Sequence, residues 1–129
     1  MDYNYNTPEE AIISLENAYT NMDLINVIAS KDFETEAKII LFRSNVELNK
    51  ETIKETAKLL ELSLIEHIEN NGFPDFSNVD RKFSNLKEID DNLFFIEETL
   101  TYDNGKAYTN TVFVTVEDKK WKVVMTEEK

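Results

Sequence analysis

Five polar residues that could transfer protons or bind a ligand lie in the last third of the chain, where two runs of alternating residues predict adjacent β-strands. Asn104-Gly105 between the runs is typical of a two-residue hairpin turn. That turn would pair Glu97 with Val112 and Thr101 with Tyr108. One face would then carry the five polar residues, Glu97, Thr99, Thr101, Tyr108 and Asn110, and with Trp121 of the next strand they are the residues expected to line a pocket.

Glu97 is the candidate general base of this patch. A carboxyl among apolar side chains such as Phe95, Val112 and Val114 has a raised pKa and can accept a proton near neutral pH. The alternative is a structural role, in which Glu97 lies at the rim or bonds a helix lysine, namely Lys38, Lys54 or Lys58. No residue is therefore assigned a catalytic role, and the sequence leans towards a protein that is not an enzyme.

The chain has few other residues that could act in catalysis or bind a metal. The chain has no cysteine, which excludes thiol catalysis and cysteine-bound metals, and its two glycines leave no phosphate-binding loop. We expect the only histidine, His67, to flank the core at a helix end, and Asp32 either to project inward or to cap a helix. The acidic pairs Asp90-Asp91 and Glu127-Glu128 lack the spacing of a calcium loop. We expect neither a metal nor a cofactor.

Helices are expected to precede the strands and to cover them. Thr7-Pro8-Glu9-Glu10 has the features of a helix start, and further helical segments are predicted after Asp23, Asp32 and Asn49, the last ending at Gly72. From Asn92 to Thr126 the chain reads as a three-stranded meander, with a further strand expected around Arg81-Lys82-Phe83. The predicted fold is α+β, with N-terminal helices on the concave face of a curved antiparallel C-terminal sheet, in a single domain spanning residues 1–129.

The expected pairing also sorts the apolar residues of the meander by face. One face forms the core under the helices, with Leu93, Phe95, Val112, Val114, Val116, Trp121, Val123 and Met125. The opposite face is expected to carry an apolar set suited to a homodimer interface: Phe94, Ile96, Leu100, Phe113 and Val124. The alternative is that a helix or the N-terminal residues Tyr3 and Tyr5 cover this set.

The net charge of the chain limits the classes of partner that it is expected to bind. The net charge of −12 argues against nucleic acids and anionic membranes, because their phosphates would be repelled. It suits a basic protein partner, although acidity also serves solubility alone. With no apolar run that could span a bilayer and no secretion signal at Met1-Asp2-Tyr3-Asn4, a cytoplasmic location is expected.

The order of elements resembles the cone-shaped nuclear transport factor 2-like superfamily. The resemblance rests on Thr7-Pro8-Glu9-Glu10-Ala11, Asn21-Met22-Asp23-Leu24, Asp32-Phe33 and a final strand Trp121-Lys122-Val123-Val124. It implies the cone fold and admits several functions, because the superfamily includes isomerases, dehydratases, ligand-binding modules and bacterial immunity proteins. The leading hypothesis is a non-catalytic protein-binding domain, such as an immunity protein that neutralises a basic toxin. The alternatives are a small-molecule-binding protein or isomerase-like enzyme that uses the cone pocket, and a structural homodimer.

Overall fold

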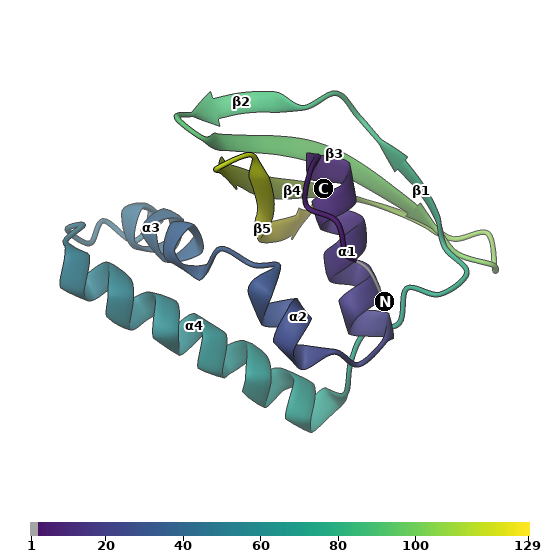
Figure 1. Ribbon diagram of the computed structural model, residues 1–129, viewed down its shortest axis with the longest axis horizontal. Coiled ribbons are helices and arrows are strands. Elements are labelled where there is room, and N and C mark those ends of the chain that lie inside the picture. The colour runs from purple at the N-terminus through teal and green to yellow at the C-terminus, as the bar shows by residue number, and fades with distance from the viewer. Residues whose placement is uncertain (1–2) are drawn as a thin grey trace. The chain divides into compact units, whose positions relative to one another are not determined.

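The computed structural model describes residues 3–129 and has an α+β fold, with four helices followed by a five-stranded antiparallel sheet that contacts the first helix (Figure 1). Two compact units make up the chain. The sheet unit contains Pro74–Lys129 and the described part of Met1–Lys31, and the helical unit is Asp32–Phe73. The fold class expected from the sequence is thus confirmed, whereas the expectation of one domain over residues 1–129 stays a prediction.

The helices begin where local side chains can accept the first free backbone N–H groups. Thr7 caps α1 (Pro8–Thr20), and its hydroxyl accepts a hydrogen bond from the Glu10 N–H at 3.0 Å. Asp23, Asp32 and Asn49 cap α2 (Leu24–Ala29), α3 (Phe33–Arg43) and α4 (Lys50–Asn71) in the same way. Helix α4 ends at Gly72, whose φ of 81° lies in the left-handed region that glycine tolerates. All four expected helices are confirmed.

Five strands form the sheet: β1 (Asp80–Phe83), β2 (Lys87–Asp90), β3 (Leu93–Thr101), β4 (Ala107–Glu117) and β5 (Lys120–Glu128). Their order is β1-β3-β4-β5, and β2 pairs with the same edge of β3 as β1 does. Strand β1 is the one expected around Arg81, whereas β2 was not expected. The turn from β2 into β3 is made by residues 91 and 92, and Asn92 adopts a φ of 59° there.

The β3–β4 hairpin differs from the expected one by one residue. The Gly105 N–H donates to the Tyr102 carbonyl and the Tyr102 N–H to the Lys106 carbonyl, both at 2.9 Å, so the loop has three residues, 103–105. Gly105 has a φ of 83°, as in a type I turn closed by a left-handed residue. Thr101 therefore pairs with Ala107 and Ile96 with Val112, and the expected pairing of Glu97 with Val112 is wrong.

A register change of one residue exchanges the two faces of a strand. Ile96, Glu98 and Leu100 are the buried residues of β3, on the inner face that they share with Val112 and Val114 of β4. The outer face carries the alternate residues of β3, which are only half buried: Leu93, Phe95, Glu97, Thr99 and Thr101. The predicted core face is therefore correct for β4 and wrong for β3.

A β-bulge changes the pairing along β5. Val116 pairs with Trp121 and Val114 with Val123, as the second turn predicts. The register then shifts, Phe113 pairs with Met125, and Val124 is the extra residue. Val123 and Val124 are both buried although they are adjacent in sequence, because a bulge turns two consecutive side chains to one face. Val124 therefore belongs to the core.

The N-terminal residues run beside β5. The Trp121 N–H donates to the Tyr5 carbonyl at 2.8 Å, and the Val123 N–H donates to the Ser30 carbonyl at 2.9 Å. The hydroxyl groups of Tyr5 and Ser30 are 2.8 Å apart and hydrogen-bonded. These bonds occupy part of the outer edge of β5, which protects an edge strand from pairing with another chain.

In the helical unit, α3 packs against α4. Few side chains of these two helices are buried, namely Ala37, Leu41, Ala57 and Ile68. None of the described helices is long and apolar enough to cross a membrane.

Candidate functional site

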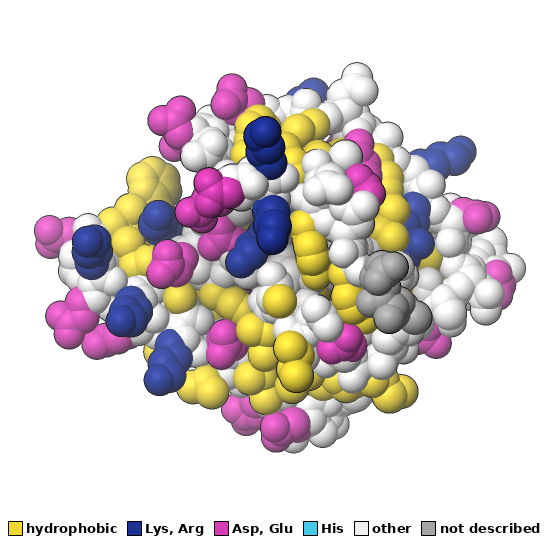
Figure 2. Space-filling model, in the orientation of Figure 1, with side chains coloured by type: hydrophobic (Ala, Val, Ile, Leu, Met, Phe, Trp, Pro, Cys, Tyr) yellow, Lys and Arg dark blue, Asp and Glu magenta, His cyan; other side chains and the backbone are white. Residues whose placement is uncertain are grey.

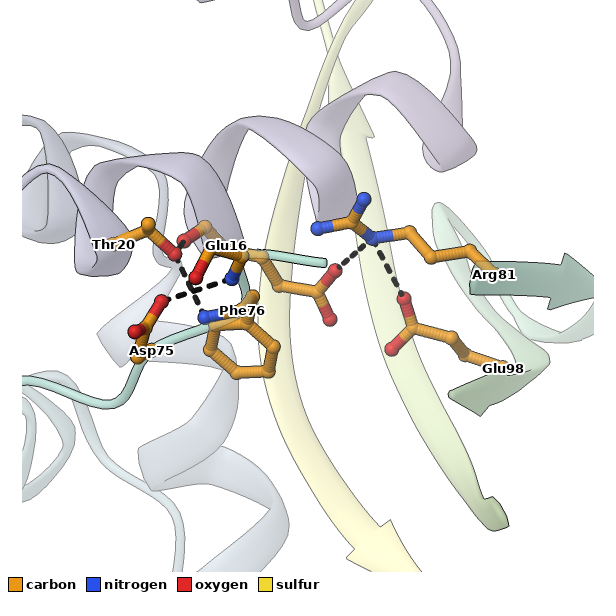
Figure 3. Close-up of polar contacts among 7 residues, drawn as sticks. Glu16, Thr20, Asp75, Phe76, Arg81 and Glu98 are labelled. Atoms are coloured by element: carbon orange, nitrogen blue, oxygen red, sulfur yellow. Dashed lines mark hydrogen bonds and ion pairs between the residues drawn. The ribbon is translucent and has the colours of Figure 1, made fainter. Parts of the chain in front are cut away.

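Three charged residues meet on the inner face of the sheet unit, where Arg81 lies between the carboxyl groups of Glu16 and Glu98 (Figure 3). Glu16 comes from α1, Arg81 from β1 and Glu98 from β3. The β1–β3 pairing places Arg81 opposite Leu100 and Phe83 opposite Glu98, so Arg81 and Glu98 project from the same face. We call these three residues the charge cluster.

The segment before β1 is tied to α1, which brings Arg81 and Glu16 together. The Phe76 N–H donates to the Thr20 hydroxyl at 2.8 Å (Figure 3). The rings of Phe76 and Tyr19 lie 6.2 Å apart. Thr20 and Glu16 are one helical turn apart on α1, so this contact aligns β1 beside the helix. Arg81 can then reach Glu16 across 65 positions of sequence.

The charge cluster is almost closed to solvent. The Arg81 Nε donates to Glu16 Oε1 at 2.6 Å and lies 3.9 Å from Glu98 Oε2. The side chain of Glu98 is 2% exposed and that of Glu16 8%. Buried ionised groups are stable only when they are paired, so one guanidinium is shared by two carboxyl groups.

Burial holds a proton on this pair of carboxyls. Loss of solvation is the main cause that raises the pKa of Glu98 to about 9, followed by its hydrogen bond to Glu16 and the charge of Glu16, while Arg81 acts in the opposite direction. At neutral pH the Glu98 carboxyl therefore holds a proton. Such a proton can act as a general acid or remain a structural hydrogen bond.

Two polar atoms of the charge cluster remain unsatisfied within residues 3–129. Arg81 Nη2 and Glu98 Oε2 are both buried and have no hydrogen-bond partner there. Arg81 Nη2 is a hydrogen-bond donor, and Glu98 Oε2 belongs to a carboxyl that can donate or accept.

Tyr102 lies towards the same end of the sheet, where burial and then the charge of Glu16 raise its phenol pKa. Its ring meets that of Tyr108 edge to face at 5.8 Å.

The predicted pocket residues are divided between the two faces of the sheet. Glu97, Thr99 and Thr101 lie on the outer face, where Glu97 forms an ion pair with Lys129 and the Thr99 hydroxyl lies 2.9 Å from that of Thr109. Tyr108 and Asn110 lie on the inner face, opposite Leu100 and Glu98. The polar patch expected around Glu97 is therefore not formed, because it rested on the two-residue turn.

Trp121 lies on the inner face of the sheet, where its neighbours are apolar side chains. Its ring lies 5.1 Å from that of Phe94, and the two side chains are half buried. Trp121 pairs with Val116 on β4, one step from Val114. Of the residues expected to line a pocket, Trp121 thus takes part in packing the core.

The predicted interface set is also divided. Ile96, Leu100 and Val124 are buried in the core, and Phe94 shares their inner face. Phe113 alone lies on the outer face, where its ring is 6.4 Å from that of Phe95. The expected exposed apolar face made by all five residues is therefore wrong.

None of the three members of the charge cluster was predicted from the sequence as a site residue. Glu16 lies one turn after Ile12 on α1, within the side of the helix that is buried, although a glutamate there gives no apolar signal. Glu98 would have been found with the correct turn, because it lies between Ile96 and Leu100 on the inner face. The residues near Arg81 in the sequence do not indicate its pairing with Glu16 and Glu98, because these partners are distant in sequence.

A second region of interest is the surface of the helical unit. It exposes large apolar side chains: Phe42 (73%), Leu59 (65%), Leu62 (50%), Leu48 (45%) and Val46 (43%). The sheet unit exposes Met22 (72%) and Ile25 (81%) to a similar degree, so it is apolar side chains that lie side by side that are typical of a binding surface. On the face drawn in Figure 2, acidic side chains are interspersed with lysines and arginines and do not gather into one continuous patch.

The described residues contain no group of three or more side chains that could hold a metal ion. His67 is exposed, and its Nδ1 lies 3.2 Å from the side-chain nitrogen of Asn71 in the last turn of α4. Asp32 accepts a hydrogen bond from the Thr35 N–H at 3.0 Å, as expected of a helix cap.

The chain matches no protein-family model, and no curated protein or solved structure resembles it at a significant level.

Proposed function

We propose that this chain is a non-catalytic, acidic domain that binds a protein. The single observation that carries the proposal is the helical unit, which exposes Phe42, Leu59 and Leu62 to solvent while it buries few side chains. Apolar side chains kept at a surface lower stability and solubility unless a partner covers them. The net charge of −12 favours a basic partner, whose approach it would accelerate.

The most specific form of the proposal is an immunity protein that neutralises a basic toxin. It is supported by the acidity of the chain and by the resemblance of its order of elements to the nuclear transport factor 2-like superfamily, which includes such proteins. The resemblance lies in the α1 start, the Asp23 and Asp32 caps and the final strand. An acidic chain would cover the active cleft of a basic nuclease with carboxylates.

Co-purification from the native host tests the proposal. The tagged chain should retain one protein with a net positive charge, and the purified pair should form a complex of defined stoichiometry by sedimentation. A chain that retains no protein, or that carries a tightly bound metabolite in its place, would contradict the proposal.

The charge cluster favours a second candidate, a small-molecule enzyme or ligand-binding protein. A protonated Glu98 with a pKa of about 9, next to the unsatisfied Nη2 of Arg81, is suited to donate a proton to a bound molecule. The Glu98→Gln variant keeps the shape and removes the proton donor. Under this candidate it should abolish turnover of any substrate found, and under the leading proposal it should leave partner binding unchanged.

A structural homodimer is the third candidate. Its interface would be the outer face of the sheet. The half-buried residues Phe95, Phe113 and Met125 lie together there, since Phe113 pairs with both of the others. A stable dimer buries about 1,200 Å² or more in total. Sedimentation of the Phe113→Lys variant tests this: a change from dimer to monomer supports the homodimer, and an unchanged mass excludes this face.

A further inference from the structure

Helix α4 has two opposite faces of different chemistry. Successive residues are rotated by about 100° around a helix. The side turned towards the interior of the helical unit carries Ile53, Ala57, Leu60, Leu64 and Ile68, of which Ala57 and Ile68 are fully buried. The side diametrically opposite carries Glu55, Leu59, Leu62 and Glu66 in one line, at spacings of four, three and four residues, and all four are exposed.

Two further glutamates, Glu51 and Glu69, flank this line, and both are exposed. We call the six residues the α4 stripe: Glu51, Glu55, Leu59, Leu62, Glu66 and Glu69. Its centre is apolar, with Leu59 65% and Leu62 50% exposed, and both of its ends are acidic. The lysines of the helix, Lys50, Lys54 and Lys58, lie on the same flank as Glu51 and Glu69, farther around the helix from the two leucines than these glutamates are.

We propose that the α4 stripe binds a basic amphipathic segment of a partner protein, in which apolar side chains are flanked by lysine or arginine. The inference rests on the proposed protein-binding function and names its surface and the chemistry of its partner. The two leucines would supply the apolar contact, and the four glutamates would pair with basic residues on both sides of it. This arrangement places apolar contacts at the centre and charged groups at the rim, as in other specific interfaces.

A second copy of this chain is a poor occupant for the same surface. In an antiparallel pair centred on the leucines, Leu59 of one copy would face Leu62 of the other, and Glu55 would then face Glu66. Like charges placed opposite each other oppose association. The charges of the stripe therefore select a basic partner over self-association.

Fluorescence anisotropy with three labelled helical peptides tests the inference on the intact chain. The probe peptide has leucines one turn apart on one face, with lysines on either side. In the first comparison peptide the leucines are replaced by serine, and in the second the lysines are replaced by glutamate. The probe should bind at least about tenfold more tightly than either comparison peptide, because each of them lacks one of the two contacts. Equal binding of the probe and the serine peptide would show nonspecific attraction and overturn the inference, as would no binding of the probe.

Matched variants locate the binding on α4. Glu55→Lys with Glu66→Lys should weaken probe binding by at least about tenfold, and Leu59→Ala with Leu62→Ala should do so by a similar factor. Glu88→Lys with Glu128→Lys makes the same change in net charge at exposed positions of the sheet unit and should change binding by less than about twofold. Circular dichroism checks that each variant keeps its helices. If the two charge-reversed variants weaken binding equally, the stripe is not the site.

The inference and the proposed function can fail separately. A natural partner that co-purifies equally with the wild type and with Leu59→Ala/Leu62→Ala would contradict the stripe and leave the protein-binding function in place. The absence of any protein partner would contradict the function itself.

Discussion

Among the described residues, only the sheet unit buries charged side chains, whereas both units expose apolar ones, Met22 and Ile25 in the sheet unit among them. The sheet unit buries Glu16, Arg81 and Glu98, whereas the helical unit exposes Phe42, Leu59 and Leu62. Each choice lowers stability relative to a conventional arrangement, since buried charges lose hydration and exposed apolar groups order water. The difference indicates where a role beyond folding is to be sought. The charge cluster is enclosed and largely self-paired, whereas the apolar surface of α4 is open to a partner.

Truncation of a buried and of a half-buried apolar side chain, at adjacent positions of β3, gives the largest expected change in stability. Ile96 is fully buried in the sheet, so Ile96→Ala should lower the free energy of unfolding by about 4 kcal/mol through lost burial and an unfilled cavity. The half-buried Phe95 tests the register, because Phe95→Ala should cost about half as much. Urea unfolding followed by circular dichroism measures both variants. A larger loss for Phe95→Ala would mean that the faces of β3 are exchanged.

The Arg81→Met variant tests whether the charge cluster depends on its single cation. Removal of the guanidinium leaves the Glu16 carboxylate buried without a counter-charge, so the free energy of unfolding should fall by about 2–3 kcal/mol, less than for a fully enclosed pair because Arg81 is partly exposed. Lys82→Met is the control, since the neighbouring side chain is exposed and should change stability by less than about 0.5 kcal/mol. Equal effects of the two variants in urea unfolding would contradict the role given to the cluster.

The proton on Glu98 predicts an unusual dependence of stability on pH. The pKa of Glu98 is about 9 in the folded chain, compared with 4.5 for an ordinary glutamate exposed to water. The folded state therefore binds the extra proton between these values, and its stabilising contribution is complete below about pH 4.5 and is lost as the pH rises towards 9. Full linkage of one proton corresponds to about 1.4 kcal/mol per pH unit.

Glu98→Gln removes this proton while it keeps the size of the side chain. The stability of the variant minus that of the wild type should therefore rise as the pH increases from 5 to 9, a range that lies within the window set by the two pKa values. Thermal unfolding over that range measures the difference. A difference that stays constant with pH would mean that Glu98 is ionised in the folded chain.

The smallest expected change in stability belongs to the α4 stripe. Leu59→Ala with Leu62→Ala should alter the free energy of unfolding by less than about 0.5 kcal/mol, because both side chains are largely exposed and alanine favours helix. Urea unfolding checks this value. A loss comparable to that of Ile96→Ala would show that the two leucines are part of a core and are not available to a partner.

Features determined by neighbouring residues were predictable from the sequence. Thr7, Asp23, Asp32 and Asn49 each cap the helix that follows them, since a short polar side chain can satisfy the first backbone donors of the helix. The end of α4 at Gly72 was predictable for the same kind of reason.

The pairing of β3 with β4 was not predictable from the turn residues alone. Asn104-Gly105 fits a two-residue loop and also the three-residue loop that forms, and the two differ by one residue in register. That single step moves Glu97 out of the inner face and Glu98 into it. The charge cluster also depends on a contact between Glu16 and Arg81, 65 positions apart, which no local pattern reveals.

Partner capture by three forms of the chain tests the account most directly. The wild type, Glu98→Gln and Leu59→Ala/Leu62→Ala are immobilised at equal density, and the amount of the co-purifying host protein is measured. The account predicts that Glu98→Gln retains the partner as the wild type does, whereas the leucine variant retains at least about tenfold less. Loss of the partner with Glu98→Gln and its retention by the leucine variant would contradict the account and place the function at the charge cluster.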